Sequence, residues 1–98
     1  MTVSEITVND VIRYLKEEPN NLTQQEIQDI SNILIAAKSF IRSYTGLTDD
    51  KIDTHEDFYI VVMVLCQDMY DNHTMYVDNT NLNRVVVTIL GMHRVNLI

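Results

Sequence analysis

Apolar side chains recur along much of the chain at alternating steps of three and four residues, which is the spacing of one face of an α-helix. The clearest series contains Ile27, Ile30, Leu34, Ala37, Ile41 and Tyr44. An adjacent stripe contains Ile33, Ala36 and Phe40. The two stripes together predict a helix whose apolar face is broader than one partner helix would cover.

Residues at both ends of this series mark the boundaries of the helix. Thr23 is a good N-cap residue, and Glu26 stands three residues later, so the two complete a capping box. Gly46 follows the series and is typical of a helix C-terminus. We therefore predict one long helix that begins after Thr23 and ends before Gly46.

A shorter helix is predicted before the long one, from about Val8 to Glu17. Thr7 can act as its N-cap, and the carboxylate of Asp10 near the helix start interacts favourably with the helix dipole. Pro19 ends this helix, because a proline disfavours the helical conformation of the residue before it.

The segment from Phe58 to Cys66 is apolar at every position, so its pattern alone does not separate a buried strand from a buried helix. We predict a helix because Thr54 can cap it with Asp57 as its pair, and because the pattern continues to Tyr70 without glycine or proline. A helix that is apolar all round must be covered all round. Part of that cover is expected from a neighbouring subunit.

A polar stretch from Asp71 to Asn81 predicts a loop, and a last helix follows from about Leu82 to His93. The apolar face of this helix is formed by Leu82, Val85, Val86, Ile89 and Leu90. Residues 94–98 are expected to be an extended tail, whose apolar end either docks on a partner or folds back onto the core. The whole pattern predicts an all-α fold, a small bundle of about four helices in a single domain of residues 1–98.

Composition supports a folded helical chain. Of its 98 residues 46% are hydrophobic, and there are only two glycines and one proline. The net charge of −7 repels nucleic-acid phosphate, so we expect no surface that grips DNA tightly. No basic region followed by an apolar stretch opens the chain, so we expect no signal peptide and no membrane contact, which favours the cytosol.

The residues that could carry chemistry do not form a recognisable motif. None of His55, His73 and His93 has a partner at the spacing of a zinc-binding motif, and His93 is favoured near a helix C-terminus by the helix dipole. Asp68, Asp71 and His73 are close enough in sequence to hold a metal ion. A solvated helix end is the simpler interpretation of these three residues.

Three further patterns have structural interpretations. The acidic connector 49–57 lacks the glycine and the closing glutamate of a calcium loop, since Thr54 and Ile60 stand at those positions. Cys66, the single cysteine, lies in the most apolar part of the chain and is typical of a core residue. The tyrosines lack the interleaved basic residues of a base-stacking platform. We therefore expect no catalytic residue, no cofactor and no metal site.

Two segments resemble the head–tail connector proteins of long-tailed bacteriophages and prophages. Residues 35–46 (IAAKSFIRSYTG) resemble the "AAxxxIxxYTG" ending of a long helix in that family, and residues 89–98 (ILGMHRVNLI) resemble its C-terminus. Between them, residues 58–70 match the apolar helix that the family places after an acidic linker. Residues 68–72 stand where the family carries a similar "lxxxxYxnR" stretch, and His73 replaces the arginine that ends it.

The resemblance implies a structural virion protein and not an enzyme. Copies of the chain would form a ring, twelve-fold to match the portal protein beneath which it docks, and would extend the channel for double-stranded DNA. DNA would pass without sequence-specific binding. The ring would also bind a downstream stopper or tail-completion protein at the head–tail interface of the virion, after assembly in the host cytoplasm.

The resemblance and the residues together suggest which side chains meet a neighbouring subunit or the portal. The candidate interface residues are Arg42, Tyr44, Tyr59, Met63, Tyr70, Arg84, His93, Arg94 and Leu97. We expect Arg42 or Arg84 to pair with acids of the neighbour. One alternative is a small helical adaptor that binds a host or phage protein through the long helix. Another is a metal-dependent enzyme that uses Asp68, Asp71 and His73.

Overall fold

The protein is a small all-α bundle, seen in a computed structural model that describes residues 2–15, 19–74, 76–77 and 82–93. Its helices are α1 (Val8–Tyr14), α2 (Gln24–Thr45), α3 (Asp49–Ile52), α4 (Phe58–Asp71) and α5 (Arg84–His93). Two short 3-10 turns, Val3–Glu5 and Pro19–Asn21, complete the order. Within these ranges no residue is in a strand, so the predicted fold class is confirmed.

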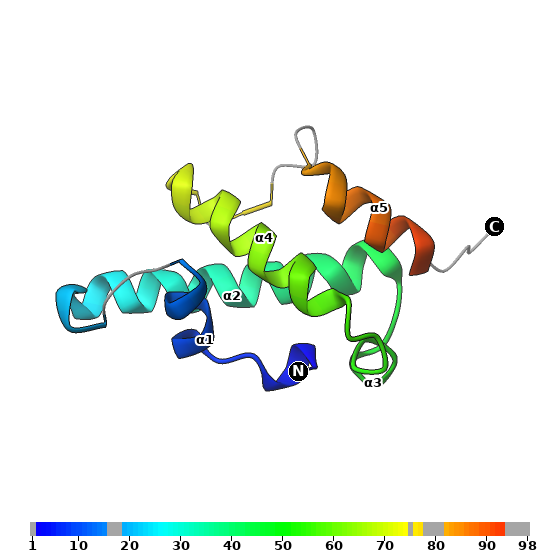
Figure 1. Cartoon of the computed structure of the whole chain (residues 1–98), viewed down its shortest axis with the longest axis horizontal. Coiled ribbons are helices and arrows are strands. Elements are labelled where there is room, and N and C mark those ends of the chain that lie inside the picture. The colour runs from blue at the N-terminus through cyan, green and yellow to red at the C-terminus, as the bar shows by residue number, and fades with distance from the viewer. Residues whose placement is uncertain (1, 16–18, 75, 78–81, 94–98) are drawn as a thin grey trace.

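The long helix α2 organises the bundle. It contacts α1, α4 and α5, and α4 also contacts α5 and the first 3-10 turn. In Figure 1, α4 and α5 lie together along one side of α2, and α1 contacts both α2 and α4. The apolar face of α2 thus meets more than one partner, as its breadth predicts.

Both predicted ends of α2 are confirmed. The Thr23 hydroxyl accepts a hydrogen bond from the Glu26 backbone N–H at 3.1 Å, and the Glu26 carboxylate accepts one from the Thr23 backbone N–H at 3.2 Å. At the other end Gly46 has a φ of 72°, and its N–H donates to the Arg42 carbonyl at 3.0 Å. Glycine suits this left-handed position because it has no Cβ to clash.

The start of α4 differs from the prediction. The connector contains the short helix α3, whose N-cap Thr48 accepts from the Lys51 N–H at 3.4 Å. The Thr54 hydroxyl donates to the Lys51 carbonyl at 2.6 Å, so it closes α3 and does not cap α4. Asp57 is the N-cap residue of α4, and its side chain makes no capping hydrogen bond. Two adjacent helices compete for the same polar residues here, and sequence spacing alone does not resolve that competition.

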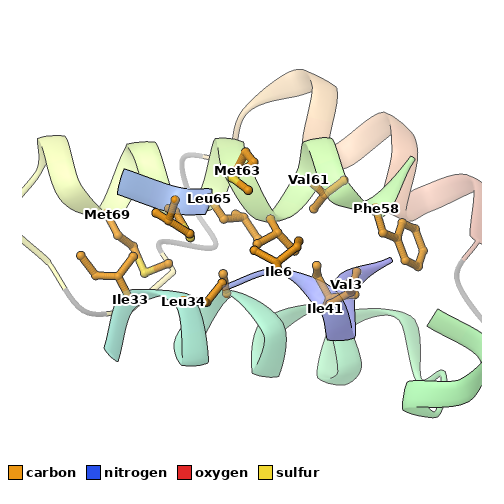
Figure 2. Packing of buried hydrophobic residues seen from close by; sticks show 14 of the residues in the cluster. Val3, Ile6, Ile33, Leu34, Ile41, Phe58, Val61, Met63, Leu65 and Met69 are labelled. Atoms are coloured by element: carbon orange, nitrogen blue, oxygen red, sulfur yellow. The ribbon is translucent and has the colours of Figure 1, made fainter. Parts of the chain in front are cut away.

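The centre of the core is an apolar layer between α2 and α4. Figure 2 shows Ile33, Leu34 and Ile41 of α2 facing α4. The buried residues of α4 are Phe58, Val61, Val62, Met63, Leu65, Cys66 and Met69. The chain itself therefore covers most of α4, and Ile60 is the large apolar residue that this helix leaves exposed. Cover from a neighbouring subunit could therefore reach only Ile60 and the partly buried side chains of α4, such as Tyr59 and Tyr70.

The N-terminal segment seals one edge of this layer. Val3 and Ile6 are buried, and Figure 2 shows both between α2 and α4. The ammonium group of Lys38 on α2 donates to the Ile6 carbonyl at 3.1 Å, which ties this segment to the long helix. In α1 the side chains of Val11 and Ile12 are buried. The helix begins at Val8 as predicted, and residues 16–18 of its predicted end lie outside the described residues.

The last helix begins at Arg84 and not at Leu82, because Asn83 accepts a hydrogen bond from the Val85 N–H at 2.8 Å. Its buried side chains are Val86 and Leu90. Val85, predicted to face the core, is exposed instead, because the buried stripe passes through Val86 and Leu90. Much of the predicted loop before this helix and all of the predicted tail 94–98 lie outside the described residues.

Candidate interaction surface and histidine–aspartate cluster

The arginine expected to meet a neighbouring subunit, Arg42, pairs within its own chain. Its guanidinium lies 3.2 Å from the Asp49 carboxylate, across the turn that joins α2 to α3. Both side chains are solvent-exposed, and such a pair is worth about 0–1 kcal/mol. Arg42 therefore has an acidic partner in its own chain, and a neighbour's acid would have to compete with Asp49.

The other candidate interface residues divide by burial. Met63 is fully buried, so it belongs to the core and is withdrawn from the interface. Tyr44 is half-buried and packs against Phe40, with ring centroids 5.5 Å apart. Tyr59 and Tyr70 are also half-buried against the core, so each offers only an edge to a partner. Arg84 is exposed, whereas Arg94 and Leu97 lie outside the described residues.

Exposed apolar side chains concentrate on α5. Met92 is 70% exposed, Val85 is 46% exposed and Val87 is also exposed. Val85, Ile89 and Met92 follow the i, i+4, i+7 spacing of a single helical stripe, in which Ile89 is partly buried against the core. We call these three residues the α5 stripe. Because α5 buries Val86 and Leu90 on another face, it is apolar both toward the core and toward solvent.

A second feature lies where the end of α5 meets the turn before α4. His93, in the last turn of α5, places its Nε2 atom 3.0 Å from Oδ2 of Asp57, the N-cap residue of α4. His55 lies in the turn between α3 and α4, and its ring centroid is 4.0 Å from that of His93. We call His55, Asp57 and His93 the histidine–aspartate cluster.

The buried ring of Phe58 supports this cluster. Its centroid lies 5.1 Å from that of His93 in an edge-to-face arrangement, and 5.2 Å from that of His55. The three cluster side chains are partly buried, and their ligand atoms all lie within 4.8 Å of one another. Two imidazole nitrogens and a carboxylate oxygen thus converge on one small, solvent-accessible volume.

Sequence reasoning missed this convergence. His55 and Asp57 are two residues apart, but His93 reaches Asp57 across a separation of 36 residues. No local spacing rule covers such a pair. A weak signal was available, because His93 ends one helix and Asp57 begins another.

The alternative metal set, Asp68, Asp71 and His73, is not brought together. In the parts of the chain that the structure describes, the histidine–aspartate cluster is the single group of three whose ligand atoms converge. The Asp71 carboxylate accepts from the Gln67 side-chain amide at 3.0 Å. Asp68 lies on the wall of a cavity of about 490 Å³, where burial and then the nearby charge of Asp71 raise its pKa.

Cys66 has the properties of a core residue. It is buried in α4, and burial raises the pKa of its thiol to about 12. The reactive form of cysteine is the thiolate, so this side chain is a poor nucleophile at neutral pH.

No protein-family model, curated protein or solved structure matches this chain. None of the helices described is both long and apolar enough to cross a membrane. A functional assignment therefore depends on the residues and surfaces described above.

Proposed function

We propose that this chain is a subunit of a phage head–tail connector, a ring that docks beneath the portal, extends the DNA channel and binds the next head-completion or tail protein. The observation that carries the proposal is the α5 stripe. An apolar stripe on the outer face of a helix whose inner face is already buried is a typical subunit contact.

The energetics favour a contact made by many copies together. Full burial of a Val or Met side chain contributes about 1.5–3 kcal/mol, and association costs several kcal/mol in lost freedom. One stripe per chain therefore supports a weak pair contact. In a closed ring each subunit takes part in two such contacts, one with each neighbour, and a portal template supplies further ones.

The charge of the chain fits the same role. A net charge of −7 opposes tight binding of DNA phosphate, and a channel that DNA must leave freely benefits from that repulsion. The exposed cation Arg84 stands at the N-terminus of α5, where its own helix dipole does not favour it. An acidic side chain from a neighbour would be favoured there, which retains Arg84 as an interface candidate.

Native mass spectrometry and light scattering on the whole chain at rising concentration, with and without the portal protein encoded in the same genome, test the proposal. Wild type should form a ring alone or on the portal. Met92→Asp should abolish ring formation, because it places a charge in the stripe. Ile35→Asp, on an exposed position of α2, is the matched control and should assemble normally. A wild type that stays monomeric and does not bind portal, or a genome that encodes no portal, refutes it.

The stripe also fits the second candidate function, a helical adaptor for one host or phage protein. In that case wild type would remain monomeric and would bind a single non-portal partner in stoichiometric amount. Met92→Asp would abolish that binding. The oligomeric state and the partner of the wild type therefore separate the two functions, and Met92→Asp tests whether the α5 stripe carries either one.

A further inference from the structure

We propose that His55, Asp57 and His93 form a binding site for a divalent transition-metal ion of the zinc class, which joins the end of α5 to the start of α4. The site does not depend on ring assembly. It departs from the sequence-based expectation that the chain has no metal site.

The distances fit such a site after a small adjustment. Zinc lies about 2.0–2.2 Å from imidazole nitrogen and carboxylate oxygen, so ligand atoms around a tetrahedral ion are roughly 3.3 Å apart. The contact between His93 and Asp57, at 3.0 Å, is slightly shorter than that separation. All the ligand atoms lie within 4.8 Å of one another. A side-chain rotation that moves one histidine nitrogen by on the order of 1 Å therefore brings the set together.

The fold holds these ligands in place from two directions. Asp57 and His55 are fixed by the turn that leads into α4, and His93 by the last turn of α5. The buried Phe58 ring packs against both imidazoles, which restricts how far each can move. Because the His93 side chain is 21% exposed, solvent still reaches the cluster. An ion can therefore enter, and a water molecule can complete its coordination.

The ligand types select the class of metal. Two imidazoles and one carboxylate suit Zn²⁺ and its first-row neighbours, whereas Mg²⁺ and Ca²⁺ prefer shells made entirely of oxygen. Three protein ligands and one open position are also the arrangement of zinc sites that keep a water ligand. Nearby acids, Asp53 and Glu56, add a local negative potential that attracts cations.

A competing account needs no metal. In it the bond between His93 and Asp57 is an ordinary hydrogen bond between two helix ends, and the stacked histidine rings are packing. The two accounts differ in whether the cluster binds an added ion specifically.

Calorimetric titration of the whole untagged chain with Zn²⁺, after removal of bound metal, distinguishes them. We expect one Zn²⁺ per chain, no measurable Mg²⁺ binding, and a melting temperature that rises with Zn²⁺. Asp57→Asn preserves the shape of the side chain but weakens it as a ligand, and His93→Gln preserves a hydrogen bond to Asp57. Each should weaken Zn²⁺ binding by about 10–100-fold or more. Circular dichroism of each variant confirms that it folds.

His73 provides the matched control. It is exposed, lies outside the cluster and has a φ of 55°, a left-handed conformation that asparagine tolerates well. His73→Asn therefore removes one imidazole without strain and should leave Zn²⁺ affinity unchanged. In the wild type, histidine side-chain NMR signals should shift for His55 and His93 and not for His73.

The NMR measurement is made on the wild type. It therefore tests whether His55 and His93 bind Zn²⁺ even where a substitution disturbs folding. Absence of Zn²⁺ binding by wild type overturns the proposal. Affinity that survives both Asp57→Asn and His93→Gln, or a shift confined to His73, also overturns it.

Discussion

The contact between α2 and α4 and the contact of α5 with the rest of the bundle are built differently. Between α2 and α4 the buried groups are apolar, with Ile41, Val61 and Phe58 fully buried. The α5 helix buries only Val86 and Leu90, and its far end is held by the polar bond between His93 and Asp57. On the same helix Val85, Val87 and Met92 remain exposed to solvent, and Ile89 is partly buried against the core.

This difference indicates where stability and binding lie in the molecule. The α2–α4 layer supplies most of the hydrophobic stabilisation. Its side chains are buried, so they are not accessible to a partner protein. The α5 helix carries both the exposed stripe and one third of the proposed metal site. Substitutions in the two regions should therefore separate unfolding from loss of binding.

The largest expected effect comes from Ile41→Asp in the α2–α4 layer. The new carboxylate would be buried without a partner, which costs several kcal/mol, a large part of the stability of a domain this size. We expect loss of the cooperative thermal transition measured by circular dichroism. Ile35→Asp lies on the same helix at a position that is 61% exposed, and it should melt close to wild type. Equal melting of the two variants would contradict the observed face of α2.

A smaller effect is expected from Leu90→Ala, which removes one of the two side chains that α5 buries. A fully buried leucine truncated to alanine costs about 2–5 kcal/mol, because a cavity remains. Met92→Ala, two residues away on the exposed side, should change the free energy of unfolding by less than about 0.5 kcal/mol. Urea denaturation of both variants measures the difference. Similar losses for both would mean that α5 presents a different face to the core.

The α2 helix was predictable because its signals are local and agree with one another. Thr23, Glu26 and Gly46 mark its ends, and its apolar period is unbroken. The start of α4 was not predictable from Thr54, because two helices lie within a few residues and Thr54 serves the first of them. The prediction that Val85 faces the core was wrong. Because α5 is apolar on more than one side, its sequence does not define a single buried stripe.

The candidate sites show the same limit more strongly. Of the expected interface residues, Met63 is buried and Arg42 has an acid in its own chain. Both outcomes depend on how the helices pack against one another. The type of a residue alone does not reveal this packing. The histidine–aspartate cluster joins residues separated by 36 positions. Only the tertiary contact of α5 with the turn before α4 brings its members together.

A test of capping compares the correctly predicted cap with the wrong one. Thr23→Ala removes a side chain that accepts the Glu26 N–H, and loss of an N-cap costs about 1 kcal/mol. For a domain of about 100 residues this lowers the melting temperature by about 4–8 °C. Thr54→Ala removes only an exposed bond to the Lys51 carbonyl and should cost less. A larger loss for Thr54→Ala would restore Thr54 as the cap of α4.

The smallest expected effect concerns Asp68, at the edge of the α2–α4 layer. Burial and the charge of Asp71 raise its pKa above the ordinary value, so the folded state holds this proton more readily than the unfolded chain. The ionised carboxylate therefore disfavours folding above its folded pKa, and this cost disappears as the pH falls below about 3.9, the value for an unperturbed aspartate. Asp68→Asn should therefore stabilise the protein slightly at neutral pH, because solvent still reaches this partly buried group and screens its charge, and it should bring no gain in acid. Chemical denaturation of Asp68→Asn and of the wild type at neutral and acidic pH measures the difference. Destabilisation of the protein by Asp68→Asn at neutral pH would contradict this account.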